Sequence, residues 1–236
     1  WGCDYPDDRI DIQSLYELGK TCFKESLGLS VSINSSSTVK EYLNKILKHI
    51  NGVMYDNPKT GKLTFKLIRN DFDIEKIPKF TPSNCENMQF TRLDWTETTS
   101  AINVQFTDAN YKYEQSTVIV QDMANVMITH NYSESQEDGT YYTVAESAKA
   151  YAQLLLTTAG YPLATLSFTT NRYAYDVAIG DAILVSWIPY GVDKQVFRVT
   201  DVDYGRLLSG GIKIAAVEDV FSFDKSTNVP ELAFGV

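Results

Sequence analysis

The spacing of hydrophobic residues predicts two helices in the first quarter of the chain. Over residues 10–26 the apolar positions fall near helical spacing, and charged residues occupy the remaining surface. Thr38 and Glu41 match a capping box. In this motif the threonine hydroxyl accepts a hydrogen bond from the backbone amide three residues later, and the glutamate side chain accepts one from the backbone amide of the threonine. An amphipathic stripe follows as far as Ile50, and the Asn51-Gly52 pair is expected to end this second helix.

A third helix is predicted in the second half of the chain. Thr143 and Glu146 repeat the capping-box pattern and open a helix that runs through about Thr158. Gly160, in a left-handed conformation, and Pro162 are expected to stop it. The predicted buried stripe of this helix contains Val144, Ala148, Tyr151, Ala152 and Leu155.

Much of the remaining chain has the alternating or β-branched pattern of strands. Residues 53–68 predict a hairpin whose turn lies in the cluster at 56–61, and residues 29–33 alternate as a single strand. Residues 133–139 are polar and are interpreted as a loop. Further strands are predicted at 88–95, 101–106, 115–120, 163–169, 181–187, 195–202 and 212–217.

These elements predict an α+β protein of two small subdomains with mostly antiparallel sheets. Residues 1–69 form a helix-strand-helix-hairpin subdomain, and residues 70–84, with two prolines and mixed charge, form a connector. Residues 85–221 form a strand-rich subdomain with one long helix, and its short strands and glycine turns indicate a barrel-like or twisted sheet. The tail at 222–236 resembles a linker, and the start at Trp1 instead of Met predicts a piece of a longer protein.

Composition then excludes several classes of protein. Among 236 residues, 21 Lys and Arg stand against 30 Asp and Glu, so a net charge of −9 argues against sequence-specific nucleic-acid binding. No apolar run approaches the roughly 20 residues of a spanning helix, which predicts no stable membrane insertion. Cys3, Cys22 and Cys85 are odd in number and widely spaced, which favours reduced thiols over a disulfide framework.

A search for metal sites finds no convincing ligand set. The two histidines, His49 on the polar side of the second helix and His130 before a loop, have no second ligand at a metal-binding spacing. Residues 56–67 resemble a calcium loop superficially, but Pro58 occupies position three and Leu67 stands where a bidentate glutamate is needed. Structural roles are therefore the more frequent explanation for both histidines.

Acidic residues do not identify a catalytic centre either. Asp71, Asp73 and Glu75 alternate and could hold a hard cation, although a solvated connector explains them more simply. A glycosidase needs two carboxyls about 5–10 Å apart, and with 30 acids some pair always satisfies that distance. The sequence nominates no catalytic, cofactor-binding or metal-binding residue.

Five aromatic residues are candidates for a carbohydrate-binding surface. Tyrosine and tryptophan faces can stack on sugar rings, although buried strand aromatics are the more frequent explanation. The candidates are Trp95, Trp187, Tyr190 and the pair Tyr141-Tyr142.

Two ordered stretches carry a family resemblance. The first joins residues 2–11, the capped helix, and the hairpin around residues 51–55 and 60–63. The second joins the strand at 101–108, the helix opened by Thr143, and the segments at 165–170, 177–185 and 197–199. Their order resembles the hub region of tailed-phage or prophage tail-tip proteins, which is related to the baseplate hub of contractile tails.

The resemblance implies a structural virion component without a catalytic motif or cofactor. Such a hub is made in the bacterial host cytoplasm, forms a ring, usually a trimer, and closes the end of the tail tube. Its implied partners are the tube and distal tail proteins and a receptor-binding fibre or puncturing spike. The alternatives are a carbohydrate-binding module of a tail tip and, less favoured, a cell-wall hydrolase that uses two carboxylates.

Overall fold

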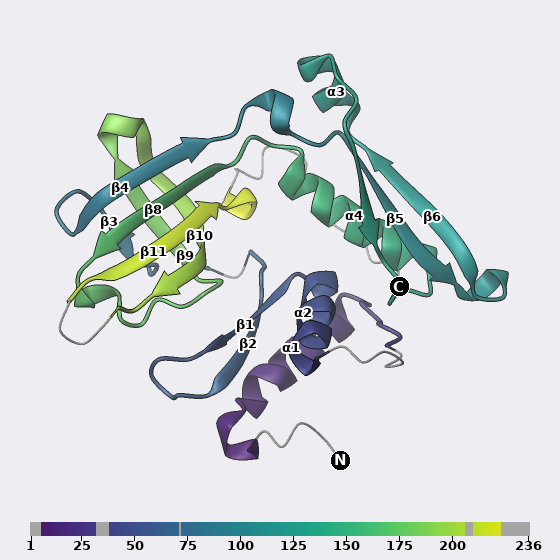
Figure 1. Ribbon diagram of the computed structural model, residues 1–236, viewed down its shortest axis with the longest axis horizontal. Helices are drawn as coiled ribbons and strands as arrows, with labels where there is room; N and C mark the ends of the chain where they lie inside the picture. The colour runs from purple at the N-terminus through teal and green to yellow at the C-terminus, as the bar shows by residue number, and fades with distance from the viewer. Residues whose placement is uncertain (1–5, 32–37, 71, 206–209, 223–236) are drawn as a thin grey trace. The chain divides into compact units, whose positions relative to one another are not determined.

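The computed structural model describes residues 6–31, 38–70, 72–205 and 210–222, which form four α-helices and eleven strands (Figure 1). These residues divide into two compact units, each of which gathers segments that lie far apart in the sequence. The first unit holds the described residues of Trp1–Leu15, Val53–Arg92 and Leu163–Thr227, and the second those of Tyr16–Gly52 and Leu93–Pro162. The predicted α+β class is confirmed, whereas the predicted subdomain boundaries stay a prediction.

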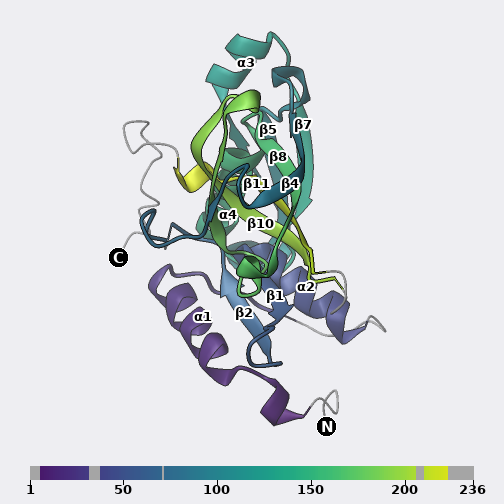
Figure 2. The ribbon, with the colours of Figure 1, turned by 90° about the vertical axis from the view of Figure 1, so that its left-hand side faces the viewer.

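A curled six-stranded sheet forms most of the first unit (Figures 1 and 2). The strand order is β3 (Lys79–Phe80), β9 (Ala182–Trp187), β10 (Val192–Asp203), β11 (Ile212–Glu218), β8 (Ala164–Thr170) and β4 (Cys85–Arg92). All neighbours are antiparallel except β3 and β9, which run parallel. The curl confirms the barrel-like sheet predicted for the C-terminal part of the chain. The largest fully buried side chains in its core are Phe80, Phe168, Ile183, Phe197, Ile212 and Ile214.

Local sequence features explain the curl of this sheet. β8 and β11 alternate buried and more exposed positions, as expected for strands with one face on the core. The register of β10 against β11 shifts between Val199 and Asp201, and such a bulge increases the local twist. Gly180 precedes β9 with φ +84°, and a Cβ there would lie 2.7 Å from Val53 Cγ2, so this turn requires glycine.

A hairpin and the segment that contains β3 also belong to the first unit. β1 (Gly52–Asp56) and β2 (Leu63–Leu67) form the predicted hairpin. Within the segment predicted as a connector, β3 pairs with Leu184 and Val185 of β9, and Phe80 is fully buried. This part of the segment therefore belongs to the sheet, because its apolar side chain fills the core.

The second unit is built on a three-stranded sheet. β6 (Glu114–Gln121) runs antiparallel and β7 (Glu134–Asp138) parallel to the central β5 (Ala101–Asp108). The helix α4 (Ala145–Ala159) packs against this sheet. Their shared core contains Ile102, Val104, Phe106, Tyr142, Ala148, Tyr151, Ala152 and Leu156. The predicted stripe is confirmed at its centre, and Leu155 packs against it, whereas Val144 is exposed and that part of the prediction is wrong.

The two predicted N-terminal helices are confirmed as α1 (Ile12–Lys24) and α2 (Val39–Ile50). Thr38 and Glu41 make both hydrogen bonds of the capping box, and Asn51 ends α2 with φ 51°. The strand predicted at 29–33 does not form over 29–31, where Ser30 N donates a single hydrogen bond to Tyr141 O. Residues 32 and 33 lie outside the described residues, as does most of the predicted tail at 222–236.

The end signals predicted for α4 are wrong in two details. Its N-cap is Val144, which makes no capping hydrogen bond through its side chain. The backbone carbonyl of Thr143, the residue before it, accepts a hydrogen bond from Ala109 N. Gly160 is not left-handed, since its φ is −79°; a Cβ there would lie 2.8 Å from Leu156 O, so close packing explains the glycine.

Two elements near α4 were not expected. The segment 133–139, interpreted as a loop, contains β7, whose side chains are polar because it is an edge strand with exposed alternate positions. The short helix α3 (Met123–Thr129) begins at Asp122, whose carboxylate accepts from Ala124 N and Asn125 N. Asn125 anchors α3 by donating to Thr98 Oγ1 and Gly160 O.

Candidate functional site

His49 is a core residue, so its predicted place on the polar side of the second helix is wrong. Its side chain is 2% exposed, and its ring lies within 4.9–5.4 Å of the rings of Tyr141, Tyr142 and Tyr151. Its Nδ1 is 2.8 Å from Lys45 O. His130 is the left-handed residue that ends α3. Among the described residues, no cluster of His, Cys, Asp and Glu could hold a metal ion.

Burial of His49 predicts a pH-dependent stability. Desolvation lowers the pKa of His49 below its ordinary 6.5, with Lys45 and Lys48 acting in the same direction; the Lys45 carbonyl and Asp138 oppose them. The unfolded chain therefore binds the proton more readily than the folded chain. The contribution of neutral His49 to stability is fully present above about pH 6.5 and is lost as the pH falls from there through the lowered pKa of the folded state. Each unit of difference between the pKa values of His49 in the unfolded and folded states corresponds to about 1.4 kcal/mol of unfolding free energy.

Urea unfolding at pH 7.5 and 5.5 measures this effect. The loss of stability at the lower pH should shrink in His49→Phe, which keeps an aromatic ring in the tyrosine cluster. The matched variant His130→Gln should behave like the wild type. Equal losses in all three proteins would contradict this role of His49.

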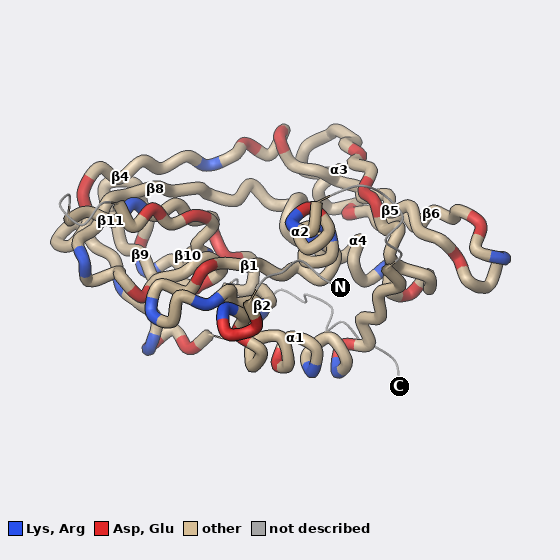
Figure 3. Tube along the Cα trace, turned by 60° about the horizontal axis from the view of Figure 1, so that its bottom comes forward, with Lys and Arg blue, Asp and Glu red and all other residues tan. Residues whose placement is uncertain are grey.

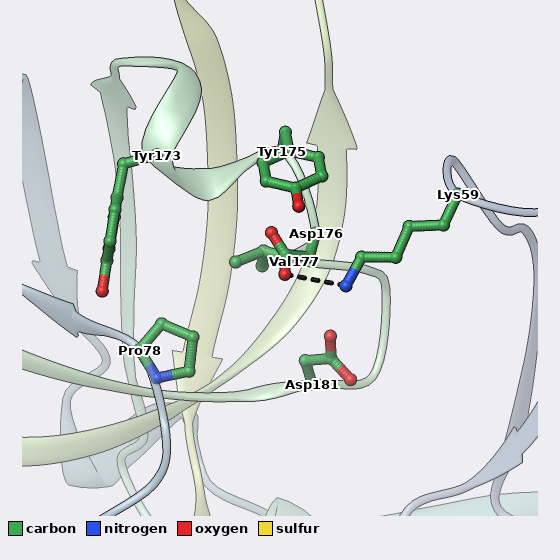
Figure 4. Close-up of a pocket in the computed structure, with 7 residues that line it drawn as sticks. All are labelled: Lys59, Pro78, Tyr173, Tyr175, Asp176, Val177 and Asp181. Carbon is green, nitrogen blue, oxygen red and sulfur yellow. Dashed lines mark hydrogen bonds and ion pairs between the residues drawn. The ribbon is translucent and has the colours of Figure 1, made fainter.

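A pocket opens in the first unit where three chain segments meet. Its volume is about 430 Å³, and Figure 4 shows the residues that line it. Lys59 comes from the β1–β2 turn, Pro78 directly precedes β3, and the other residues come from the β8–β9 connection. The lining residues are Lys59, Pro78, Tyr173, Tyr175, Asp176, Val177 and Asp181.

The charges of this pocket are already paired. Lys59 Nζ lies 2.8 Å from Asp176 Oδ2 and 5.6 Å from the centre of the Tyr175 ring. The hydrogen bond with Asp176 raises the pKa of Lys59. Asp181 binds Lys66 Nζ at 2.7 Å and accepts from Ala178 N at 2.9 Å. Both carboxylates of the pocket are held in ion pairs with lysines, whereas a glycosidase needs one carboxyl group that is free to donate a proton, so the pocket does not favour a hydrolase.

In the acidic run of the predicted connector, the described members Asp73 and Glu75 are exposed to solvent. Asp71 lies outside the described residues, and Asp73 pairs with Lys76 at 2.9 Å. The hydrogen bond with Lys76 lowers the pKa of Asp73. This is the solvated arrangement that the simpler interpretation predicted.

The aromatic candidates for sugar binding separate into two groups. Tyr141 and Tyr142 are buried, and the partly buried Trp187 packs against the core of the six-stranded sheet. Trp95 and Tyr190 are exposed, and Tyr190 stacks on Phe90. None of these five residues lines the pocket.

The tyrosines that do line the pocket were not singled out from the sequence. Tyr173 is 63% and Tyr175 55% exposed, and both follow the capping residue Asn171. The sequence signal that could have pointed to them is a pair of tyrosines in a polar turn between two strands. The sequence could not show that Lys59 and Pro78 also line this pocket, because only the fold brings them there.

Helix α1 presents an apolar surface that the described residues leave uncovered. Ile12, Tyr16, Gly19 and Phe23, which we name the α1 stripe, recur at i, i+4, i+7 and i+11 and therefore lie on one face. The side chains of Ile12 and Tyr16 are 66% exposed and that of Phe23 is 86% exposed. No atom lies within 4 Å of the position that a Cβ of Gly19 would take. No residue of α1 is buried.

A second exposed apolar group lies on α3. Met123, Met127 and Ile128 are each more than half exposed. The helix carries no charged residue, while acidic and basic residues are distributed over the rest of the chain (Figure 3). No helix among the described residues has the length and hydropathy needed to cross a membrane.

Comparison with known proteins gives one family match. The model of a family described as "Putative phage tail protein" matches residues 38–202. A search of curated proteins finds no significant match.

Several solved structures share the fold. They include a chain in the virion of a native gene transfer agent particle (TM-score 0.62, 13% identity, covering 86% of this chain and 46% of that chain). The tail protein from Neisseria meningitidis MC58 has a TM-score of 0.58 and 15% identity, with 87% and 67% covered. The 43 kDa tail protein of prophage MuSo2 from Shewanella oneidensis has a TM-score of 0.54 and 12% identity, with 89% and 66% covered. The chain thus spans about half to two thirds of these proteins.

Proposed function

Because the chain belongs to this family of phage tail proteins, we propose that it forms the hub at the end of a phage or prophage tail. The hub joins the tail tube to distal receptor-binding or puncturing parts. Its role is mechanical and involves no catalysis and no cofactor. The chain is made in the bacterial host cytoplasm and ends in the virion tail.

The α1 stripe is the observation that carries this proposal. A lone folded chain gains nothing by exposing Phe23 and Tyr16 to water, since burying such a side chain contributes roughly 1.5–3 kcal/mol. Exposed apolar surface of this kind marks contacts between proteins. We therefore assign the α1 stripe to a contact with a neighbouring tail subunit.

Open sheet edges provide a second means of assembly. β4 and β6 are edge strands of eight residues each, and their outer backbone groups can pair with another chain. In a ring of identical subunits, one surface of each copy contacts a different surface of the next copy. The ring closes when the rotation between neighbouring copies is a whole fraction of a full turn. These features support a homotrimeric ring with tube, distal tail and fibre or spike proteins as partners.

Immunogold labelling of purified particles tests the location. Antibody raised against the chain should label one end of the tail, away from the head, in every intact particle. Particles from cells lacking the gene serve as the control for antibody specificity. Label spread along the whole tube, or confined to the head, would contradict a hub.

A further inference from the structure

We propose that the pocket between Tyr173, Tyr175 and the Lys59–Asp176 pair binds a neutral sugar ring. The pocket lies wholly within the first unit, so its geometry does not depend on assembly. The proposal is independent of the hub, because a tail component can bind a sugar wherever it sits in the tail.

The walls of the pocket suit the apolar face of a sugar. Figure 4 shows Tyr173 and Pro78 on one side, Lys59 on the opposite side, and Tyr175 with Asp176 between them. Both tyrosine residues are more than half exposed, and a tyrosine offers a large contact area at a low cost in side-chain entropy. The C–H groups of a pyranose can pack on such rings and on the proline.

The polar groups of the pocket suit hydroxyls. Among the described residues, the hydroxyls of Tyr173 and Tyr175 and the second carboxylate oxygen of Asp176 make no hydrogen bond, so all three can accept from a ligand. The tyrosine hydroxyls can also donate to it. Hydrogen-bond acceptors and donors placed around an apolar wall are complementary to a sugar ring, which has apolar C–H faces and carries hydroxyls around its edge.

Charge pairing excludes a strongly ionic ligand. Two lysines and two aspartates form the pairs Lys59–Asp176 and Lys66–Asp181, so the charges in and beside the pocket cancel. An anion would have to draw a lysine away from its carboxylate, and a cation would have to displace a lysine. A neutral ligand needs neither change.

The size of the pocket sets the scale of the ligand. Its volume of about 430 Å³ lies near the lower end of the range of roughly 300–1,000 Å³ for small-molecule sites. A mono- or disaccharide unit of a cell-surface glycan has this scale, whereas a folded protein partner does not enter such a space.

Saturation-transfer NMR on the full chain provides the test. The probes are the methyl glycosides of glucose, galactose, mannose and N-acetylglucosamine, with glucuronic acid and glucosamine 6-phosphate as charged comparisons. We expect saturable binding of at least one neutral probe with a Kd of about 1 mM, at low and at high salt.

Variants assign the binding to this pocket. Tyr173→Ala and Tyr175→Ala should each weaken binding roughly 2- to 10-fold, as loss of a stacked ring predicts. Tyr111→Ala removes a similarly exposed tyrosine outside the pocket and should leave binding unchanged. Unfolding midpoints equal to that of the wild type show that the variants fold.

Three results would overturn the proposal. They are no saturable binding of any neutral probe, binding that survives in the Tyr173→Ala/Tyr175→Ala double variant, and a preference for charged probes that salt abolishes. Each of these leaves the immunogold result unaffected, so failure of the sugar site and failure of the hub can be told apart.

Discussion

Replacing Arg198 with methionine is expected to destabilise the first unit by about 3–5 kcal/mol. Arg198 and Asp219 form a buried ion pair, with side chains only 5% and 2% exposed. Arg198 Nε lies 2.9 Å and Nη2 2.6 Å from Asp219 Oδ2. Removing the guanidinium leaves the carboxylate of Asp219 buried without its counter-charge. An uncompensated buried charge of this kind strongly destabilises the folded state.

The same arginine also joins separate segments of the first unit. Its Nη1 donates to Gly180 O and its Nη2 to Arg69 O, so the turn before β9 and the end of the hairpin are tied to β10. Its guanidinium lies 5.3 Å from the centre of the Phe72 ring. Loss of the side chain therefore leaves two carbonyl groups without this donor as well.

Urea unfolding followed by circular dichroism measures the loss. Lys76→Ala, which removes the exposed partner of Asp73, should change stability little because that pair is screened by water. The double variant Arg198→Met/Asp219→Leu should recover much of the loss, since an apolar pair leaves no uncompensated charge. A small effect of Arg198→Met alone would show that water reaches this pair.

Polar substitution of the α1 stripe is expected to block incorporation of the chain into tails. Tyr16→Ser combined with Phe23→Ser removes two large side chains from the proposed contact and should weaken it by roughly 100-fold or more. Both side chains are exposed in the single chain, so its own stability should change by only about 0.5 kcal/mol for each substitution.

Complementation of a strain lacking the gene measures this effect as the number of complete tailed particles. Tyr111→Ser removes a tyrosine of similar exposure and should restore particles as well as the wild type. Normal particle numbers with the Tyr16→Ser/Phe23→Ser variant would show that neighbouring subunits do not use this face.

Local signals predicted the elements that depend on local chemistry. The capping box at Thr38 and Glu41 formed as expected, because both hydrogen bonds lie within four residues. The same pattern at Thr143 and Glu146 failed, because the backbone of Thr143 is tied to Ala109 by a distant contact. A matching pattern therefore specifies a cap only where tertiary contacts leave the backbone free to adopt it.

Features that depend on distant partners could not be predicted in this way. β7 has no apolar alternation, and its pairing with β5 lies some 30 positions away in the sequence. His49 falls on the polar side of α2 by spacing, yet Tyr141 and Tyr151 cover it from elsewhere in the chain. The pocket joins Lys59 to Tyr175 across more than a hundred positions, so its residues could not be grouped before the fold was known.

Cryo-EM of intact tails tests the proposed role most directly, because it shows both where the chain lies and what covers α1. We expect three copies in a ring at the end of the tube, with Tyr16 and Phe23 buried against a neighbouring subunit. A chain located elsewhere in the particle, or an α1 stripe that faces solvent in the assembled tail, would contradict the proposed hub.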